Sequence, residues 1–530
     1  MVAATMFWIL LSCASTLYFV LMCMKRGVFG ARLRGKSPER KSLRGPLSLP
    51  LIGSMYKLGS PEGPFAVFTD LSHKYGQIFE MQLGVSKCVI VSSYALIKEV
   101  LITKGGHFGG RPDFLRFHHL FGGDRNNSLA LCDWSDLQRK RRSIARSFCS
   151  PRGGSSQQEE ISRVAVDEIA QMFEYLEDPR NAEILAGERP VKPIVLAAVA
   201  NMFTKYMCST RFDYYQDEEF KHVTRAFDDI FWDINQGYAV DFLPWLKVFY
   251  SGHLTRLSDW ANDIRGFILR RIIEPRRASL DLDTEIPRDF TDALLFHLQS
   301  TQSELSWQHI LFELEDFLGG HSAVGNLVMM VLANAVIHPE IQTRIQEECD
   351  AVIRGKLERG VEVGSLMVSP RDKPQLPYTE SVIWETLRVS SSPIVPHVAT
   401  CDTDISGYPV AKDTMVFLNN YSLNLGEEYW GADARQFKPE RFLKREEGET
   451  VDRVSRPDFF MPFSTGKRTC IGQKLVQGFA FVTVTMLLAK YNVSAPPTVD
   501  VTKSIQSSCL ALPPDCFNLI FTKRKLPVSS

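Results

Sequence analysis

The sequence predicts a mostly α-helical protein of the α+β class with small β-sheets, preceded by an N-terminal transmembrane helix. Three observations support this prediction: long glycine-poor stretches with apolar residues at helical spacing, strand-like alternation confined to short pieces, and an uncharged apolar run at the start of the chain. Hydrophobic residues make up 45% of the 530 residues and charged residues 23%, so a large core can form. Collagen, coiled coil and global disorder are excluded.

The predicted helices dominate the middle of the chain and share an apolar face at the helical period. They cover Glu159–Leu176, Phe220–Ile234, Leu254–Arg270, Glu304–Ile337, His338–Arg354, Tyr378–Val389 and Gln473–Lys490. The strand-like pieces lie near Ile78–Val91, Ile394–Thr400, Thr414–Leu418 and Phe517–Thr522. Because no internal repeat or low-complexity linker divides the sequence, we expect one large body.

The first 24 residues carry no charge, and Ala3–Met24 is long enough, at about 1.5 Å per residue, to span the roughly 30 Å of a bilayer core. The basic run from Lys25 to Arg44 contains one acid, Glu39, and places the rest of the chain in the cytosol by the positive-inside rule. A cleaved signal peptide is the alternative, but no basic segment precedes the apolar run. We expect an anchor at 1–24, a basic and Pro/Gly-rich hinge at 25–53, and one domain at 54–530.

The charge and the cysteine content of the chain limit its possible partners and its cellular compartment. Lys plus Arg and Asp plus Glu both number 61, so the formal net charge is zero and we expect no nucleic-acid partner. The 11 cysteines fit a reducing compartment better than a disulfide framework, because they are odd in number and form no Cys-x-x-Cys pair.

Cys470 stands in a context that points to chemistry. It lies in the loop 463–472, just before the helix predicted from Gln473. A helix N-terminus directs backbone N–H groups and a positive dipole end at the sulfur, which favours the thiolate. A lone cysteine is usually a small buried hydrophobe. Four further residues of this loop are of types that suit a binding site, so the explanation that Cys470 is only a buried hydrophobe is weak.

Those four positions have complementary uses. Gly466 and Gly472 let the backbone approach a flat, bulky group, Arg468 offers a fork to a carboxylate, and Phe463 can shield the sulfur from water. The loop resembles the haem-binding loop of cytochrome P450s, F-x-x-G-x-R-x-C-x-G, at every fixed position. This resemblance implies a P450 fold over 54–530, haem b as cofactor, and Cys470 as the axial ligand of the haem iron.

Other segments extend the resemblance over most of the chain. Glu385 and Arg388 match the family's E-x-x-R, and 439–442 match its P-E-R-F segment. The resemblance implies a structural network of Glu385, Arg388 and Arg441 beneath the haem loop. The segments 108–112, 338–340 and 376–378 also resemble P450 sequences.

The contacts to the haem propionates depart from the family pattern. P450s usually carry W-x-x-x-R, whereas Gln138 stands four residues after Trp134. At 100° per residue, Arg141 returns to within about 20° of Trp134, so we expect Trp134, Gln138 and Arg141 on the propionate face. His397 stands where many P450s place a propionate-binding residue, and a satisfied loop histidine is the alternative.

The predicted distal helix also departs from the family. P450s read [AG]-G-x-[DE]-[TS] there, whereas 319–323 reads Gly-Gly-His-Ser-Ala, without the acid and alcohol that handle protons. Two explanations stay open. Either His321, Ser322 or a substrate hydroxyl with ordered water passes protons, or the protein rearranges an already oxygenated substrate without activating oxygen.

The segments 317–326, 391–397 and 462–473 resemble the Spook/Spookier group of arthropod P450s. That resemblance implies a microsomal enzyme of the endoplasmic reticulum membrane with a cytosolic catalytic domain, acting on a sterol downstream of 7-dehydrocholesterol in ecdysteroid biosynthesis. The apolar candidates for its pocket wall are Phe114–Phe121, Phe317, Ile394–Val395 and Leu510–Leu512.

The sequence has no dinucleotide fingerprint, so electrons must come from another protein. The resemblance implies NADPH–cytochrome P450 reductase, and the run Arg139–Arg142 with Lys467 is a candidate docking surface, with a solvated charge run as the alternative. We expect a haem-thiolate monooxygenase that oxidises a sterol or ecdysteroid precursor. The alternatives are a P450-fold isomerase or dehydratase and a non-catalytic haem or sterol binder.

Overall fold

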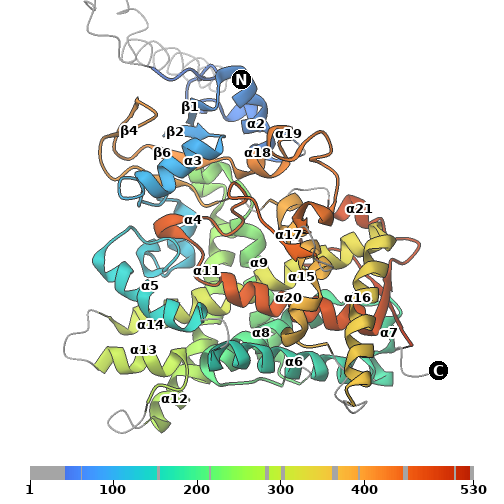
Figure 1. Cartoon of the computed structure of the whole chain (residues 1–530). Coiled ribbons are helices and arrows are strands. Elements are labelled where there is room, and N and C mark those ends of the chain that lie inside the picture. The colour runs from blue at the N-terminus through green and yellow to red at the C-terminus, as the bar shows by residue number, and fades with distance from the viewer. Residues whose placement is uncertain are drawn as a thin grey trace, which may run out of the picture.

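The computed structural model describes residues 42–60, 62–151, 155–213, 216–280, 286–299, 305–360, 368–391, 394–445, 452–505 and 509–525. The predicted anchor at 1–24 lies outside the described residues, as does the hinge before residue 42. The described chain is mostly helical with small sheets, as the sequence predicts (Figure 1).

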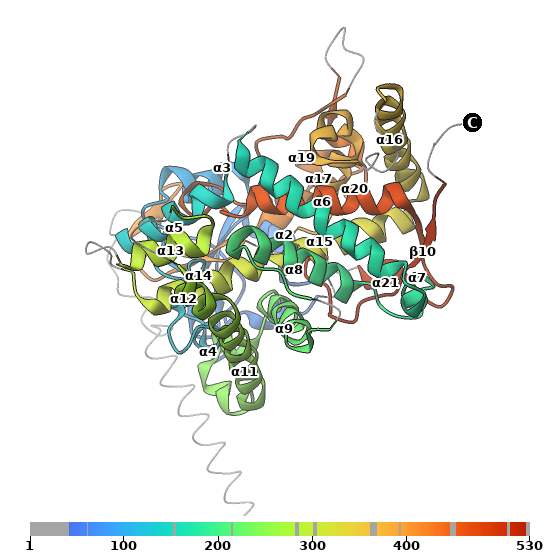
Figure 2. The ribbon, with the colours of Figure 1, turned by 90° about the horizontal axis from the view of Figure 1, so that it is seen from below.

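Two helices run through the middle of the molecule and pack against each other, α15 (Gly320–Ile337) and α20 (Gln473–Lys490). Figure 2 shows α6 (Ser156–Leu176) beside α20, and α8 (Lys192–Cys208) packs along α15. Nearly every residue of α8 and α15 is buried, because both helices are apolar on all sides. An all-round apolar helix gives little amphipathic signal, and α8, unlike α15, was not among the predicted helices.

The other predicted helices are confirmed with shifted ends. They are α9 (Glu218–Ile234), α11 (Ser251–Ile268), α16 (Pro339–Glu358) and α17 (Pro377–Val389). The remaining α-helices of the described chain are α2 (Pro64–Tyr75), α3 (Tyr94–Lys98), α4 (Leu115–Leu120), α5 (Asp136–Cys149), α7 (Ala182–Leu185), α10 (Ala239–Phe242), α12 (Glu274–Ser279), α13 (Phe290–Gln299), α14 (Trp307–Leu318), α18 (Asn420–Leu425), α19 (Glu427–Trp430) and α21 (Val501–Ser504).

The long helix expected over Glu304–Ile337 is two helices, α14 and α15, that meet at Gly319. The Ser322 N–H donates to the Gly319 carbonyl, 3.2 Å away, which tightens the chain at this point. The stretch Trp307–Ile337 is the one helical segment of the described chain that is long and apolar enough to cross a membrane. Because 78% of its apolar window is buried, it fits a core position.

The largest sheet has the strand order β1-β2-β6-β3. β1 (Ile78–Leu83) and β2 (Ser86–Val91) form an antiparallel hairpin, and β6 (Met415–Leu418) pairs in parallel with β2 and antiparallel with β3 (His397–Val398). Three two-stranded sheets pair β4 (Thr403–Ile405) with β5 (Tyr408–Val410), β7 (Leu443–Lys444) with β8 (Arg453–Val454), and β9 (Tyr491–Ser494) with β10 (Ile520–Lys523).

The described part of the predicted hinge, residues 42–53, lies against the four-stranded sheet. The Glu80 N–H donates to the Arg44 carbonyl at 2.9 Å, and Gly53 forms an isolated bridge with Leu83. A side chain at Gly45 would lie 1.8 Å from the Glu80 carbonyl oxygen, so only glycine allows this close approach. Residues 44–53 are therefore held to the edge of β1.

Candidate active site

Cys470 is presented at the N-terminus of α20. Its N–H donates to the Phe463 carbonyl at 2.9 Å, which closes the loop, and the Phe463 ring lies 6.2 Å from that of Trp384 on α17. The Cys470 side chain is accessible by area, yet burial raises the pKa of its thiol. The sulfur therefore faces a recess within the protein rather than the outer surface. The N–H groups of Gly472 and Gln473 and the charge of Arg142 act to lower that pKa.

The two loop glycines have different roles. Gly466 has φ +71°, and a Cβ there would lie 2.2 Å from the Leu101 carbonyl oxygen. Glycine is thus required at this position, because the chain here lies against the π-helix Glu99–Thr103. Gly472 caps α20 with φ −76°, and nothing lies within 4 Å of a Cβ placed there. The open space at Gly472 is compatible with the predicted approach of a bulky group.

Three buried side chains and the half-buried Trp134 gather beside this loop. Arg468 donates to the carbonyls of Gly109 and Cys132, the latter at 2.7 Å, and its guanidinium lies 5.5 Å from the Trp134 ring. Arg142, on α5, donates to the Thr469 carbonyl. β3 holds His397, whose Nδ1 donates to the Phe108 carbonyl at 2.7 Å.

The positive charges of this group act on one another. Arg111, which donates to the Val395 carbonyl at 2.9 Å, belongs to the same group. Burial, together with repulsion from neighbouring arginines, lowers the pKa of Arg111 to about 9 and that of Arg142 to about 10. Burial holds the pKa of His397 well below its usual range, with added repulsion from Arg111 and Arg468. An anion placed among these groups would relieve the repulsion and favour a protonated His397.

The same group leaves several polar atoms unused. Trp134 Nε1, Arg142 Nε, Arg468 Nη1 and His397 Nε2 are buried, and no protein atom among the described residues hydrogen-bonds to them. Buried polar atoms in native proteins almost always have partners. Unpaired nitrogens in a cationic recess, beside a cysteine just before the N-terminus of a helix, fit a flat cofactor with carboxylate groups and a metal that accepts sulfur. The residues thus fit haem: Trp134, Arg142, Arg468 and His397 would hold the propionates, and Cys470 would hold the iron.

One of the predicted propionate residues, Arg141, is placed elsewhere. Arg141 is fully buried and pairs with Glu313 of α14, 3.1 Å away, and with the Asn127 carbonyl. The helical-angle argument misplaced Arg141 because Trp134 precedes the helix, whose N-cap is Ser135. Gln138 donates to the Leu129 carbonyl at 3.0 Å. The arginine beside the loop is instead Arg142.

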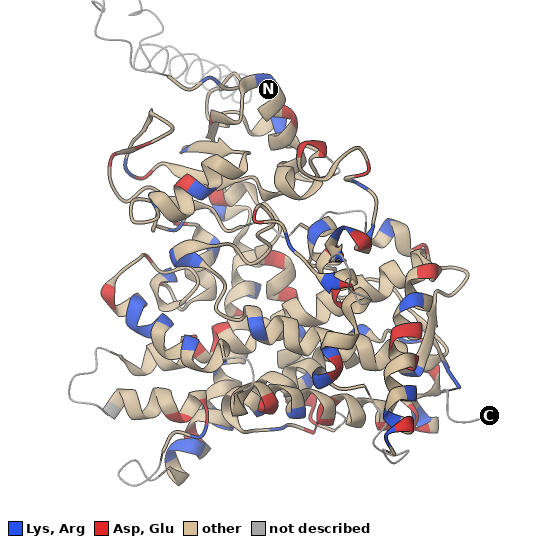
Figure 3. Ribbon diagram, viewed as in Figure 1, with Lys and Arg blue, Asp and Glu red and all other residues tan. Residues whose placement is uncertain are grey.

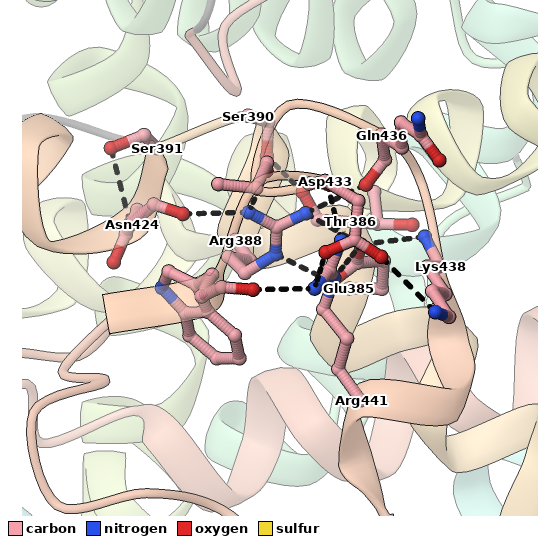
Figure 4. Close-up of polar contacts among 12 residues, drawn as sticks. Glu385, Thr386, Arg388, Ser390, Ser391, Asn424, Asp433, Gln436, Lys438 and Arg441 are labelled. Atoms are coloured by element: carbon pink, nitrogen blue, oxygen red, sulfur yellow. Dashed lines mark hydrogen bonds and ion pairs between the residues drawn. The ribbon is translucent and has the colours of Figure 1, made fainter. Parts of the chain in front are cut away.

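The predicted Glu385, Arg388 and Arg441 do come together (Figure 4). Arg388 binds both carboxylate oxygens of Glu385 at 2.6 Å, and the two side chains are fully buried. Arg388 also donates to the carbonyls of Asn424, Ala434 and Gln436 at 2.5–2.9 Å. Arg441 lies 3.6 Å from Glu385 and is held mainly by Asp433, at 2.8 Å. The network joins α17 to the segment 424–441.

The two residues predicted for a proton relay, His321 and Ser322, are turned away from the accessible face of α14 and α15. Over 316–323 the accessible positions are Asp316, Gly319, Gly320 and Ala323, at helical spacing, whereas His321 and Ser322 are buried. His321 Nδ1 donates to the Leu318 carbonyl at 2.7 Å, and its ring packs edge-on against Phe227. His321 thus satisfies a carbonyl at the break between α14 and α15.

Sequence reasoning missed Asp316, the one titratable residue on that accessible face. Its carboxylate accepts from Ser128 Oγ at 3.0 Å and from the Leu129 N–H at 2.5 Å. Burial raises its pKa to about 6. The only sequence signal was an acid three residues before the Gly319-Gly320 pair.

An apolar pocket of about 450 Å³ lies between α2, α4, α10 and the main sheet. Two of the predicted wall segments contribute to it, through Phe114, Phe117, Ile394 and Val395. Phe317 instead packs against Phe290, 5.0 Å between ring centroids. Leu512 donates its N–H to Asn326 Oδ1 at 2.9 Å, and the 510–512 turn does not line this pocket.

A cysteine just before the N-terminus of α20, a buried cationic recess with unpaired donors and an apolar pocket are together the features expected of a haem-thiolate protein. The sequence model described as Cytochrome P450 matches residues 43–521. The chain is 46% identical to Cytochrome P450 307a1 of Drosophila melanogaster over 502 residues, covering 91% of this chain and 89% of the relative. The protein belongs to the cytochrome P450 family and is a P450 monooxygenase.

Two more distant relatives have similar coverage. Cytochrome P450 1A1 of Platichthys flesus is 30% identical over 464 residues, covering 84% of each chain, and the steroid 17-alpha-hydroxylase/17,20 lyase of Ictalurus punctatus is 28% identical over 501 residues, covering 92% of this chain and 91% of the relative. The Drosophila match confirms the resemblance to the Spook/Spookier group. Members of the family bind haem b, which supplies the iron that activates oxygen, and draw electrons from NAD(P)H through a reductase.

Proposed function

We propose that this P450 oxidises a sterol precursor in ecdysteroid biosynthesis, with electrons from NADPH–cytochrome P450 reductase. The apolar pocket of about 450 Å³ beside β3 carries the proposal, because it suits a bulky substrate that is almost entirely hydrocarbon. The 46% identity to P450 307a1 and the match to a steroid hydroxylase agree with it.

The test is to express the chain with the reductase, supply 7-dehydrocholesterol and keto-sterol intermediates, and identify products by mass. We expect an oxidised sterol whose formation needs NADPH, reductase and oxygen. Turnover without all three would instead favour the isomerase or dehydratase, which Ala323 at the alcohol position makes the second candidate. Sterol binding without any turnover would indicate a non-catalytic binder.

We also infer that the protein sits on the endoplasmic reticulum membrane through a single anchor at 1–24, with the catalytic domain in the cytosol. Exposed apolar residues lie close in sequence to segments that line the apolar pocket: Leu47 and Leu51 precede the lining residue Met55, and Val248 and Phe249 follow the lining residue Phe242. Val248 and Phe249 are 73% and 82% exposed, which is costly in water and favourable at a lipid surface. Replacing both by serine should weaken vesicle binding of the protein lacking residues 1–41, and unchanged binding would contradict this surface.

The reductase docking surface is proposed on α5 and the cysteine loop. A groove of about 490 Å³ there is lined by Trp134, Arg139, Arg146 and Lys467 among others, and Figure 3 shows the basic residues of α5. Replacing Arg139 and Lys467 by glutamine should slow the first electron transfer and flatten its salt dependence. The matched control is Arg180→Gln, on the exposed turn after α6. An unchanged rate and salt dependence would place docking elsewhere.

A further inference from the structure

The apolar pocket is closed on one side by a buried polar network centred on Arg116 of α4. Arg116 Nη1 contacts Asp233 Oδ1 at 2.5 Å, and its Nε and Nη2 contact Asp241 Oδ2 at 2.9 and 2.6 Å. The same guanidinium donates to the carbonyls of Asp233 and Gln236. The Tyr238 ring covers it at 4.4 Å.

This network joins parts of the chain that are otherwise separate. Arg116 lies on α4, whereas its partners lie at the end of α9, in the connection that follows and on α10, more than a hundred residues later. Arg116, Tyr238 and Asp241 also line the apolar pocket. Separation of α4 from α10 would therefore open the pocket wall.

The network is strong in charge but incomplete in hydrogen bonds. All three charged side chains are at least 90% buried, so the ion pairs are shielded from water. Asp241 Oδ1, however, is buried without a hydrogen-bond partner among the described residues. His253 of α11 lies 2.9 Å from the second oxygen of Asp233. An unsatisfied carboxylate oxygen lowers the cost of release, because water can reach it only when the network opens.

We propose that Arg116 is a positioning residue that latches α4 to the α9–α10 connection, and that bulky apolar ligands enter the apolar pocket, and pass through it to and from the haem iron, when this latch releases. The proposal goes beyond the proposed function and does not depend on the substrate's being a sterol. It predicts that the latch controls the rate of passage of large ligands and leaves small ones unaffected.

The test uses two nitrogen ligands of haem iron that differ in size, clotrimazole and imidazole, and follows the haem absorbance shift by stopped flow with the full-length haem-loaded protein. Arg116→Met should raise both the association and the dissociation rate of clotrimazole by about tenfold, since one buried charge partner is lost. The imidazole rates should stay within about twofold. Asp241→Asn keeps the shape of the network and should give a smaller acceleration of clotrimazole alone.

Arg276→Met is the matched control, because Arg276 is a mostly buried arginine that bridges two aspartates, Asp289 and Asp292, away from this pocket. This variant should leave the association and dissociation rates of both clotrimazole and imidazole unchanged. Equal acceleration of both ligands by Arg116→Met would show general loosening and overturn the proposal, as would unchanged clotrimazole rates. If Arg116→Met does not fold, the clotrimazole and imidazole rates of Asp241→Asn test the proposal in the same way. The outcome does not depend on the sterol assay, because neither ligand is a sterol.

Discussion

Replacing Arg388 by lysine should destabilise the protein far more than the same change at the surface. Arg388 is fully buried, with two contacts to Glu385 and three to the carbonyls of Asn424, Ala434 and Gln436. Lysine keeps the charge but cannot hold both carboxylate oxygens and three carbonyls. Each buried acceptor left without a donor costs about 1–3 kcal/mol, so we expect a loss of about 3–5 kcal/mol.

The sequence offers a control with the same spacing. Glu160-Ile161-Ser162-Arg163 is also E-x-x-R, but its Arg163–Glu160 pair lies exposed on α6. Arg163→Lys should cost less than about 1 kcal/mol. Urea unfolding gives both values, and the carbon monoxide spectrum of the reduced protein reports the fraction that retains thiolate-bound haem. A loss below about 1 kcal/mol for Arg388→Lys, with the spectrum intact, would refute the reasoning.

Four further changes test the site. Cys470→Ser should abolish the thiolate-type carbon monoxide spectrum, and a retained spectrum would remove the ligand assignment. Arg142→Met should weaken haem retention in a haem-transfer assay, since one unpaired donor of the cationic recess is lost; retention equal to the native protein's would count against the propionate placement. His321→Leu should lower the free energy of unfolding by about 1–3 kcal/mol by leaving the Leu318 carbonyl without its donor, while haem binding persists. Glu315 lies on α14 and pairs with Arg265, and burial raises its pKa to about 8. The folded state therefore keeps a proton that the unfolded state releases above about pH 4.5, so the free energy of unfolding should fall as the pH rises to about 8. Glu315→Gln should flatten this fall in urea midpoints measured from pH 5 to 9.

The fold class and the loop around Cys470 could be predicted from the sequence because local signals carry them. The amphipathic helices show periodicity, and the loop's specified residues lie within ten positions. The Glu385–Arg388 pair could be predicted from the sequence for the same reason, because the two residues lie on one turn of the same helix.

Features set by distant contacts could not be predicted. Arg141 and Arg142 exchange roles because α5 begins at Asp136, and the sequence did not reveal that start. The need for glycine at 466 comes from the Leu101 carbonyl, more than three hundred residues earlier. His321 looked like a proton donor because its partner, the Leu318 carbonyl, is exposed only by the break at Gly319.

The Glu385–Arg388 network also constrains the order of folding. The carbonyls that complete the Arg388 fork lie 36, 46 and 48 residues further along the chain. Until that segment docks, the two side chains of α17 remain better hydrated in water than in a dry interior. Their dehydration is therefore tied to closure of a long loop, which is slow compared with helix formation. We therefore expect docking of the segment 424–441 onto α17 to be a slower step than formation of α17 itself.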